Sequence, residues 1–435
     1  MKMKKYLFVM LCALFFLSAC SVDDNGYQTY KMSVQVTYPS GRNWNPEGVT
    51  VTLKDSYGTL YNAVTDQSGK AEFSVPVGIY QVVSSDRQAA EGYAYYYNGL
   101  KNGVLVSAQP EKETKVTIDF TESKSGQIII KELYIGGCQK LPSGAYSNDK
   151  YCILYNNSDQ TATLENLCFG FVLPINAHVA NDNYTSDGTL NYESEGFIPA
   201  GYGIWYFQQV LTLEPGKQAV VAIYGAIDHT VTYPSSVNLS KADYCMYDIA
   251  DFSSAAMYPA PDASIPTEHY LLAEKYGQGT AWAIGNFGPG FFIFTTEGTT
   301  PEEFAHTTDY WYNGGSATAP NRCLKIPTHW ILDAVEVFNE PNVAKSKKRL
   351  TVAVDAGYTL LTQSYGHTSY RNVDKEATEA IPENEGKLVY GYRYGEDPNG
   401  IDAEASLKNG ARIVYMDTNN STNDFHQRSQ ASLKD

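Results

Sequence analysis

The stretch Tyr30-Lys31-Met32-Ser33-Val34-Gln35-Val36-Thr37-Tyr38 decides the fold that we expect for the first part of this chain. Its apolar and aromatic side chains occupy every second position, which is the period of a strand with one buried face. The same alternation returns downstream, and turn-forming residues separate the repeats. The recurring segments are 49–53, 71–75 and 116–120. The pattern therefore predicts a small antiparallel β-sandwich that spans residues 29–121.

The middle of this domain carries a family-like pattern. Thr65-Asp66-Gln67-Ser68-Gly69 is followed by Ala71-Glu72-Phe73 and then by Pro76-Val77-Gly78-Ile79-Tyr80. The succession resembles the carboxypeptidase-regulatory-like and collagen-adhesin B-type repeats, which share T-D-x-x-G, x-A-x-F and P-x-G-x-Y elements. The resemblance implies an immunoglobulin- or prealbumin-like sandwich that serves as a stalk rather than as a catalyst.

We expect a second domain, residues 126–435, after a polar linker at 122–126. Several of its segments resemble the lamin-tail domain, which implies an immunoglobulin-like β-core. The domain is much longer than a usual lamin tail, and the extra length lies in insertions near 177–196 and 226–281. Ile153 stands where that family has Glu, so no binding site is carried over. The segments are QIIIKELY at 127–134 and residues 151–158, 162–167, 213–221, 330–336, 367–371 and 417–425.

The composition favours an all-β protein. The chain has 35 Tyr, 35 Gly and 19 Pro, and abundant aromatic residues with frequent turn formers are typical of sheets. The formal net charge is −16, and no window concentrates Lys and Arg. We therefore expect no nucleic-acid partner, because binding to phosphates needs a basic face.

The N-terminus has the pattern of an export signal. Three lysines precede an apolar run at 6–17 that is too short to span a bilayer comfortably. Leu17-Ser18-Ala19-Cys20 follows and resembles the bacterial lipobox. The resemblance implies a signal peptide at 1–19, acylation of Cys20 with chains such as palmitate, and a tether at 20–28. The alternative is an ordinary secretory peptide with a chance cysteine.

The residues after Cys20 bear on location. Ser21-Val22-Asp23-Asp24-Asn25-Gly26 resembles the export signal of Bacteroidetes-type surface lipoproteins, although a periplasmic tether would look similar. The chain as a whole resembles an uncharacterised family of Bacteroidetes outer-membrane lipoproteins. This implies a lipid-anchored protein of the outer membrane that faces the cell exterior and serves capture or uptake beside a TonB-dependent receptor.

The sequence offers little catalytic chemistry. It contains no GxSxG, HExxH or P-loop motif, and its seven histidines lack metal-ligand spacing. We expect a non-enzymatic protein without cofactor or metal that binds a ligand or partner such as a glycan. The alternatives are an adhesin or structural protein and, third, a glycan-acting hydrolase, because glycosidase carboxylates can lie anywhere in a sequence.

Two aromatic segments are candidate binding surfaces. Tyr93-Ala94-Tyr95-Tyr96-Tyr97-Asn98 could stack on planar ligands or, alternatively, pack against the next domain. The segment 306–315 combines aromatic, amide and acidic residues with two glycines. The ligand-binding residues that we predict are Tyr310, Trp311 and Tyr312, with Trp205 as a second platform; the alternative is that these rings belong to the core.

Acidic and cysteine residues leave further alternatives open. The oxygens of residues 417–424 could hold calcium or form a structural turn. Asp333 and Glu336 should lie on opposite faces of a strand, because their separation is odd. Five cysteines remain after Cys12 and Cys20, and they could give one disulfide or serve as buried apolar residues. These are Cys138, Cys152, Cys168, Cys245 and Cys323.

Overall fold

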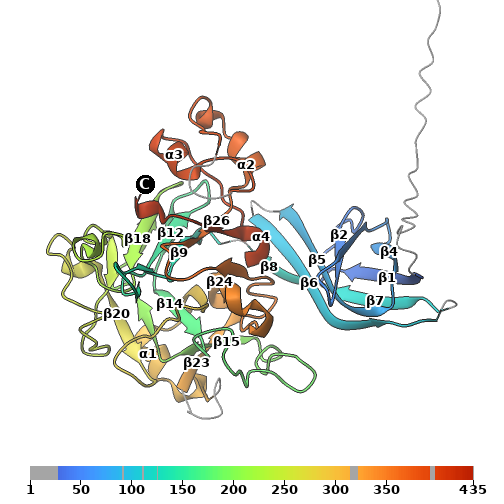
Figure 1. The fold of residues 1–435 in the computed structure, drawn as a ribbon, viewed down its shortest axis with the longest axis horizontal. Helices are drawn as coiled ribbons and strands as arrows, with labels where there is room; N and C mark the ends of the chain where they lie inside the picture. Colours follow the sequence, from blue (N-terminus) through green and yellow to red (C-terminus); the bar gives the residue numbers. More distant parts are fainter. Residues whose placement is uncertain are drawn as a thin grey trace, which may run out of the picture.

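The computed structural model describes residues 28–90, 93–109, 112–124, 126–313, 322–391 and 397–434. Strands dominate, so the predicted all-β fold class is confirmed. The chain forms a small lobe and a large lobe, which lie side by side in Figure 1. The signal peptide 1–19, Cys20 and almost all of the tether 20–28 lie outside the described residues. Within the described part, no helix combines the length and the apolar content needed to cross a membrane.

The small lobe is a sandwich of two sheets, and its core follows the predicted alternation. Met32, Val34 and Val36 are buried on one face of β1, where they meet the second sheet in one core. One sheet has the order β4-β1-β7 and the other the order β3-β2-β5-β6-β8. The strands are β1 (Tyr30–Thr37), β2 (Thr50–Asp55), β3 (Leu60–Val64), β4 (Lys70–Val75), β5 (Gly78–Ala90), β6 (Tyr93–Val106), β7 (Thr114–Asp119) and β8 (Thr121–Lys124).

The predicted linker at 122–126 is wrong in its first half. Residues 121–124 form β8, which pairs with β6 and places Glu122 opposite Tyr97. Arg42 holds the Glu122 side chain with two bonds of 2.6 Å, so this stretch is part of the small lobe. Among the named strands, none of β1 to β8 pairs with any strand from β9 to β27. The domain boundaries themselves stay a prediction.

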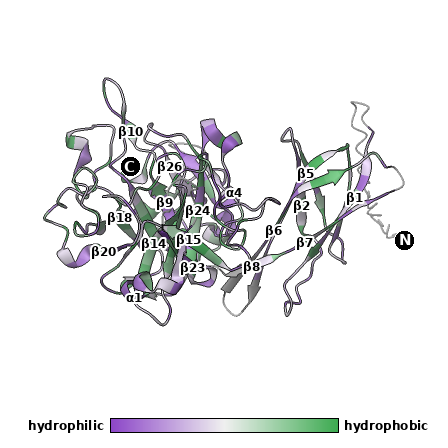
Figure 2. Ribbon diagram, turned by 90° about the horizontal axis from the view of Figure 1, so that it is seen from below, coloured by the Kyte–Doolittle hydropathy of each residue, from purple (hydrophilic) through white to green (hydrophobic). Residues whose placement is uncertain are grey.

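The large lobe is organised by one 15-stranded sheet. Strand β9 lies inside it between β12 and β26, and all seven of its residues are buried. Figure 2 shows hydrophobic strands gathered at the centre of this lobe, around β14, β15 and β18. The strands are β9 (Ile128–Tyr134), β12 (Tyr151–Asn156), β14 (Leu167–Val172), β15 (Phe197–Gly201), β16 (Gly203–Tyr206), β18 (Gln218–Ala222), β19 (Tyr244–Met246), β20 (Tyr270–Lys275), β21 (Gly290–Thr295), β22 (Trp311–Asn313), β23 (Arg322–Pro327), β24 (Ile331–Asn339), β25 (Thr359–Leu361), β26 (Thr368–Arg371) and β27 (Phe425–Arg428).

Part of the expected insertion near 226–281 is built into this sheet. Strands β19 and β20 arise from it and connect β18 to β16 by backbone pairing. The insertion near 177–196 instead forms turns around one isolated bridge, Tyr184 to Leu190. Two small ribbons complete the strands: β10 (Cys138–Gln139) with β11 (Ala145–Tyr146), and β13 (Ala162–Leu164) with β17 (Leu211–Leu213).

Helices are short and peripheral. Thr300 caps α1 with a reciprocal pair of bonds to Glu303, and Pro301 opens the first turn. The α-helices are α1 (Pro301–His306), α2 (Lys375–Glu379), α3 (Ala403–Lys408) and α4 (Ser421–Asp424). The 3-10 segments are η1 (His229–Val231), η2 (Thr267–His269), η3 (Thr308–Tyr310), η4 (Thr328–Trp330), η5 (Glu340–Lys345), η6 (Pro382–Asn384) and η7 (Ser432–Lys434).

The five cysteines that remained open are all buried, and no disulfide joins any of them in the described part of the chain. Cys152 lies on β12 and Cys168 on β14, and burial raises the pKa of both thiols well above the ordinary value. The structure therefore favours the alternative in which these residues act as small apolar core side chains.

Candidate functional site

The predicted aromatic segment lies at the edge of the large sheet. Tyr310 ends η3 with 37% of its surface exposed, and its ring packs 4.6 Å from that of Phe304. Trp311 begins β22; its indole N–H donates to the Ala305 carbonyl at 3.0 Å, and the Arg322 guanidinium covers its ring at 3.7 Å. Contacts within the protein therefore already cover much of the surface of these two rings.

Two of the predicted platforms serve the core. Tyr312 is half-buried, and its ring meets that of Phe197 edge-on at 5.2 Å. Trp205 is wrong as a ligand platform, because none of its surface is exposed. Its ring stacks on Phe252 at 5.5 Å inside the main core. In the aromatic run at 202–207, Trp205 and Phe207 are buried while Tyr202 and Tyr206 are half-buried, so the run mainly indicates the core.

The tyrosine-rich segment at 93–98 belongs to the small lobe and reaches the large lobe through its last residue. Of its described side chains, Tyr95 and Tyr97 are buried in the core of the small lobe. Asn98 is buried too, and its side-chain N–H donates to the Thr418 carbonyl of the large lobe at 2.9 Å. The packing alternative therefore holds for Asn98, which contacts the large lobe, whereas Tyr95 and Tyr97 pack within the small lobe.

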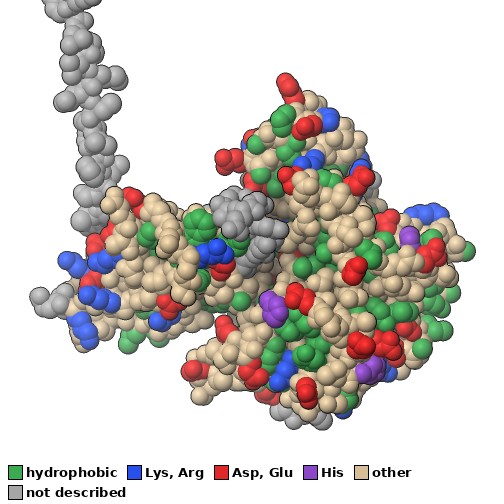
Figure 3. All heavy atoms as spheres, turned by 180° about the vertical axis from the view of Figure 1, so that it is seen from behind, with side chains coloured by type: hydrophobic (Ala, Val, Ile, Leu, Met, Phe, Trp, Pro, Cys, Tyr) green, Lys and Arg blue, Asp and Glu red, His purple; other side chains and the backbone are tan. Residues whose placement is uncertain are grey.

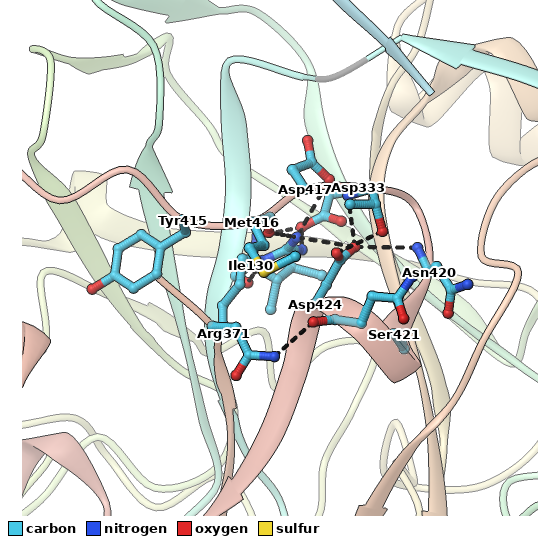
Figure 4. Close-up of polar contacts among 12 residues, drawn as sticks. Ile130, Asp333, Arg371, Tyr415, Met416, Asp417, Asn420, Ser421 and Asp424 are labelled. Carbon is cyan, nitrogen blue, oxygen red and sulfur yellow. Dashed lines mark hydrogen bonds and ion pairs between the residues drawn. The ribbon is translucent and has the colours of Figure 1, made fainter. Parts of the chain in front are cut away.

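Three aspartates surround one arginine in the large lobe, as Figure 4 shows. Arg371 of β26 pairs with Asp333, lies 3.3 Å from an oxygen of Asp417 and lies 3.8 Å from an oxygen of Asp424. All four side chains are buried. The guanidinium also donates to the carbonyls of Ile130 and Met416 at 2.8 and 2.9 Å, so it ties β9 and β26 to the segment that closes the chain.

Burial controls the protonation of these acids. It raises the pKa of Asp333 and Asp417, even though Arg371 opposes the shift. The same two influences bring the pKa of Asp424 to about 6. One buried guanidinium cannot stabilise three buried carboxylates equally, because each charge must be taken out of water. The cluster thus has a structural role, and burial makes its three acids easier to protonate than free carboxyl groups.

Asp333 and Glu336 do not form an acid pair. Glu336 binds a different arginine, Arg349, whose Nε donates to it at 3.0 Å. The segment 417–424 is a structural turn, which was one of the two alternatives. Asp424 accepts bonds from the backbone N–H groups of Thr418 and Asn420 at 2.8 and 3.1 Å. Among the described residues, no group of three or more His, Cys, Asp and Glu side chains is placed to hold a metal ion.

This turn forms one wall of a cleft between the two lobes. The cleft has a volume of about 320 Å³. The small lobe contributes Glu122, and the large lobe contributes η4, the start of β24, the segment 353–354 and the turn at 419. Figure 3 shows a notch between the two lobes on one face. The lining residues are Glu122, Thr328, His329, Ile331, Ala353, Val354 and Asn419.

The negative charge of Glu122, the carboxylate of the cleft, is balanced by an arginine. Arg42 binds Glu122 through Nε and Nη2, and the Tyr97 hydroxyl donates to the same carboxylate at 2.5 Å. These bonds, with that of Arg42 the strongest, keep the pKa of Glu122 below its ordinary value. The remaining polar groups of the lining are a hydroxyl, an imidazole and an amide, from Thr328, His329 and Asn419. Such a lining can donate and accept hydrogen bonds without net charge.

The large-lobe wall is braced from behind. Asp355 accepts bonds from the backbone N–H and the hydroxyl of Ser421 at 2.8 and 2.6 Å, which joins the segment next to Val354 to helix α4. The Asn419 carbonyl accepts from the Ala356 N–H at 2.7 Å, and Asn419 has a positive φ of 51°. Asn tolerates this left-handed conformation better than most residues do. The wall is therefore held by bonds within the protein itself.

None of the cleft residues was a predicted ligand-binding residue. Glu122 was placed in a linker, and Asn419 was weighed only as part of a calcium loop. Glu122 and Asn419 lie close together only because the two lobes meet. The hydrophobic period of one segment cannot predict a contact between residues some 300 positions apart in the sequence. The only usable signal was the alternative that the tyrosine-rich segment packs against the next domain.

Comparison with known proteins gives one family match. Residues 214–391 match the model of a family described as "Protein of unknown function (DUF4876)". This is less than half of the chain, and it includes the cleft residues at 328–354 but neither Glu122 nor Asn419. No curated protein matches the chain.

The chain is also similar to solved structures. A DUF4876 family protein from Bacteroides thetaiotaomicron VPI-5482 matches over 92% of this chain and 96% of its own, with 20% identity and a TM-score of 0.53. At that identity the likeness concerns the fold. The Bacillus anthracis TIE protein has 14% identity and a TM-score of 0.17, with 44% of this chain and 27% of its own covered. A DUF3823 family protein from Parabacteroides merdae has 13% identity and a TM-score of 0.15, with 43% and all of its chain covered.

Proposed function

We propose that this protein is a lipid-anchored, non-enzymatic binding protein of the outer membrane that holds a small uncharged ligand in the cleft between its two lobes. The proposal includes acylation at Cys20, a stalk-like first domain, a lamin-tail-like scaffold in the second, and exposure to the cell exterior. The observation that carries it is the cleft of about 320 Å³ to which both lobes contribute.

The size and chemistry of the cleft favour a small hydroxyl-rich ligand. Its volume lies within the range of ordinary small-molecule sites, roughly 300–1,000 Å³. Ile331, Ala353 and Val354 offer apolar surface, while Thr328 and Asn419 offer hydrogen-bonding groups. A short neutral glycan combines C–H faces with hydroxyl groups and fits this combination. An anionic ligand is disfavoured, since the one lining charge is a carboxylate bound to Arg42.

An unmet hydrogen-bonding group lies close to the cleft. The side-chain oxygen of Asn98 is buried without a partner, although its N–H bonds the Thr418 carbonyl. Thr418 precedes the lining residue Asn419, and the strand partner of Asn98, Thr121, precedes the lining residue Glu122. Buried polar atoms normally have partners, and those without one need an explanation. A donor from a ligand or a bound water would satisfy this oxygen.

Binding rather than catalysis is supported by how the acid is used. The Glu122 carboxylate accepts hydrogen bonds from Arg42 and Tyr97, and its lowered pKa makes it a weak base. A general base works best with a pKa near the operating pH. The resemblance to TonB-associated lipoproteins supports the further proposal that the bound ligand is passed to an outer-membrane receptor.

The test fills the cleft. In Ala353→Trp, a bulky ring occupies the space between the lobes, and Ile249→Trp places the same ring on an exposed turn outside the cleft. Both variants and the parent are titrated with maltohexaose, xylohexaose, mannohexaose and the acidic hexagalacturonate. We expect a neutral hexasaccharide to bind the parent and Ile249→Trp equally and to lose binding to Ala353→Trp at unchanged melting temperature. Equal binding to Ala353→Trp, or preference for hexagalacturonate, would refute the proposal.

A further inference from the structure

The end of the small lobe that lies away from the large lobe has a defined set of strand ends. Strand pairing places the start of β1 beside the end of β4, with Tyr30 opposite Val75, and the start of β7 beside Met32. In the other sheet, Gly78 at the start of β5 pairs with Val106 at the end of β6. The opposite ends of these sheets carry β8 and Asn98, which meet the large lobe. We call the first set the outer end.

Large apolar side chains are exposed at this outer end. Ile79 and Leu105 are direct cross-strand partners, so they share one face, and Val77 lies two residues before Ile79. The turn between β2 and β3 adds Tyr57 and Leu60, since Asp55 pairs with Tyr80 and Lys54 with Leu60. The five side chains keep between 51% and 94% of their surface exposed: Tyr57, Leu60, Val77, Ile79 and Leu105.

Lysines accompany these apolar side chains. Lys31, Lys54, Lys112 and Lys115 are all exposed and belong to the same strand ends. Figure 3 shows Lys and Arg side chains gathered on the side of the small lobe that faces away from the large lobe. The described acids at this end are Asp55, Glu72 and Glu113. Asp55 accepts from the N–H groups of its own turn, and Glu72 lies 2.7 Å from Lys70. Glu113 lies 3.5 Å from Lys70 and 3.8 Å from Lys115.

The charge of the chain is divided between its two parts. Residues 28–124 contain nine Lys and Arg against ten Asp and Glu, whereas residues 125–435 contain 20 against 36. The acidity therefore resides almost wholly in the large lobe, and the small lobe is close to neutral. An anionic surface would repel the large lobe and tolerate the outer end of the small lobe.

The N-terminal segment leaves the fold at this same end. Tyr30, the first residue of β1, lies opposite Val75, one residue before the turn that carries Val77. Only eight positions separate Cys20 from Gln28, and an extended chain gains at most about 3.6 Å per residue, a reach of about 30 Å. Acylation at Cys20 therefore keeps the outer end within that distance of the bilayer.

We propose that the outer end of the small lobe is a membrane-contact surface that seats on a phospholipid bilayer next to the acyl anchor. The proposal rests on the lipid anchoring of the proposed function. Aromatic and aliphatic side chains enter the headgroup region, and lysines reach the phosphates, as at other interfacial contacts. The lipid chains hold the protein, and this surface sets its orientation, with the large lobe and its cleft directed away from the membrane.

The test places an environment-sensitive probe at each end of the same lobe. The lipidated protein carries Leu105→Cys or, as the matched control, Val64→Cys, which is 59% exposed at the opposite end of β3. Each introduced thiol is labelled with nitrobenzoxadiazole under native conditions, where the described cysteines are buried. The proteins are reconstituted into vesicles of phosphatidylethanolamine and phosphatidylglycerol at a 7:3 ratio and floated on a density gradient.

We expect the probe at residue 105 to shift to shorter wavelength and gain emission in floated samples, while the probe at residue 64 stays aqueous. Cys20→Ser protein, which lacks the lipid chains, should bind concentrated vesicles only weakly, and replacing Lys112 and Lys115 by Gln should lower that residual partition coefficient by about fivefold per lysine. A residue 105 probe that stays aqueous in protein that floats would overturn this inference and leave the anchor intact. If the protein with an intact Cys20 floats no better than Cys20→Ser protein, the lipid anchor is overturned, and this inference with it. A concentration-dependent shift without vesicles would show that a second copy covers this end instead.

Discussion

Replacing Arg371 by Met should destabilise the large lobe, because the change leaves buried carboxylates without their cation, which alone costs about 3–5 kcal/mol. The Met side chain keeps much of the volume and removes the charge that faces Asp333, Asp417 and Asp424. It also leaves the carbonyls of Ile130 and Met416 without their donor. Each orphaned buried acceptor costs a further amount of about 1–3 kcal/mol when no water replaces the donor, so a loss of about 5 kcal/mol or more is expected.

The assay is urea unfolding followed by tryptophan fluorescence, which reports on the large lobe because four of the five tryptophans lie in it. The loss should be greatest at pH 8 and smaller at pH 5. Without the guanidinium the pKa values of the three acids rise further, so falling pH neutralises them in the folded state and restores stability. The control is Lys375→Met, which removes an exposed cation paired with Glu379 at 3.9 Å and should change stability by less than about 0.5 kcal/mol. A loss below about 1 kcal/mol for Arg371→Met, or a loss that does not depend on pH, would refute this structural role of the cluster.

Other expectations concern single residues. Asp424→Asn should flatten the pH dependence of unfolding between pH 4 and 6: the pKa of Asp424 is raised to about 6 in the folded state, so the parent loses about 2–3 kcal/mol as pH rises through that window. A parallel pH profile in chemical denaturation would count against this. Trp205→Ala should lower stability by about 3–5 kcal/mol, whereas Tyr310→Ala should cost about 1 kcal/mol or less, and melting curves that reverse this order would contradict the core assignment. Cys20→Ser should move the protein from the membrane to the soluble fraction, and retention in outer-membrane vesicles would count against the anchor.

A strand could be predicted from the sequence where the apolar residues of a single segment show the period of a strand. The alternation from Tyr30 to Tyr38 correctly predicted β1 and the buried face that it presents to the small-lobe core. The run at 127–134 predicted β9, although it did not show that Lys131 and Glu132 are buried with partners. Lys131 pairs with Glu404 at 2.5 Å, and Glu132 accepts from the Tyr151 hydroxyl at 2.8 Å. A charged residue in a strand normally indicates solvent, and only distant partners reverse that inference.

The site was harder to predict because aromatic composition does not distinguish a core from a platform. Trp205 and Tyr310 belong to similar aromatic runs, yet one is fully buried and the other is at a sheet edge. The difference depends on how many sheet neighbours each strand has, which is a tertiary property. Glu122 could not be recognised as a cleft residue, since its partners Arg42 and Tyr97 come from other strands of the small lobe. The cleft itself exists only where two separately patterned lobes meet.

The most direct test of the proposed binding site is backbone hydrogen exchange on the intact protein, with and without a saturating neutral hexasaccharide that binds it. We expect slower exchange in peptides that cover both walls of the cleft, 121–124 from the small lobe and 328–331 and 353–356 from the large lobe. Exchange at 310–313 should not change. Protection confined to the aromatic edge at 310–313, with both cleft walls unaffected, would contradict the account.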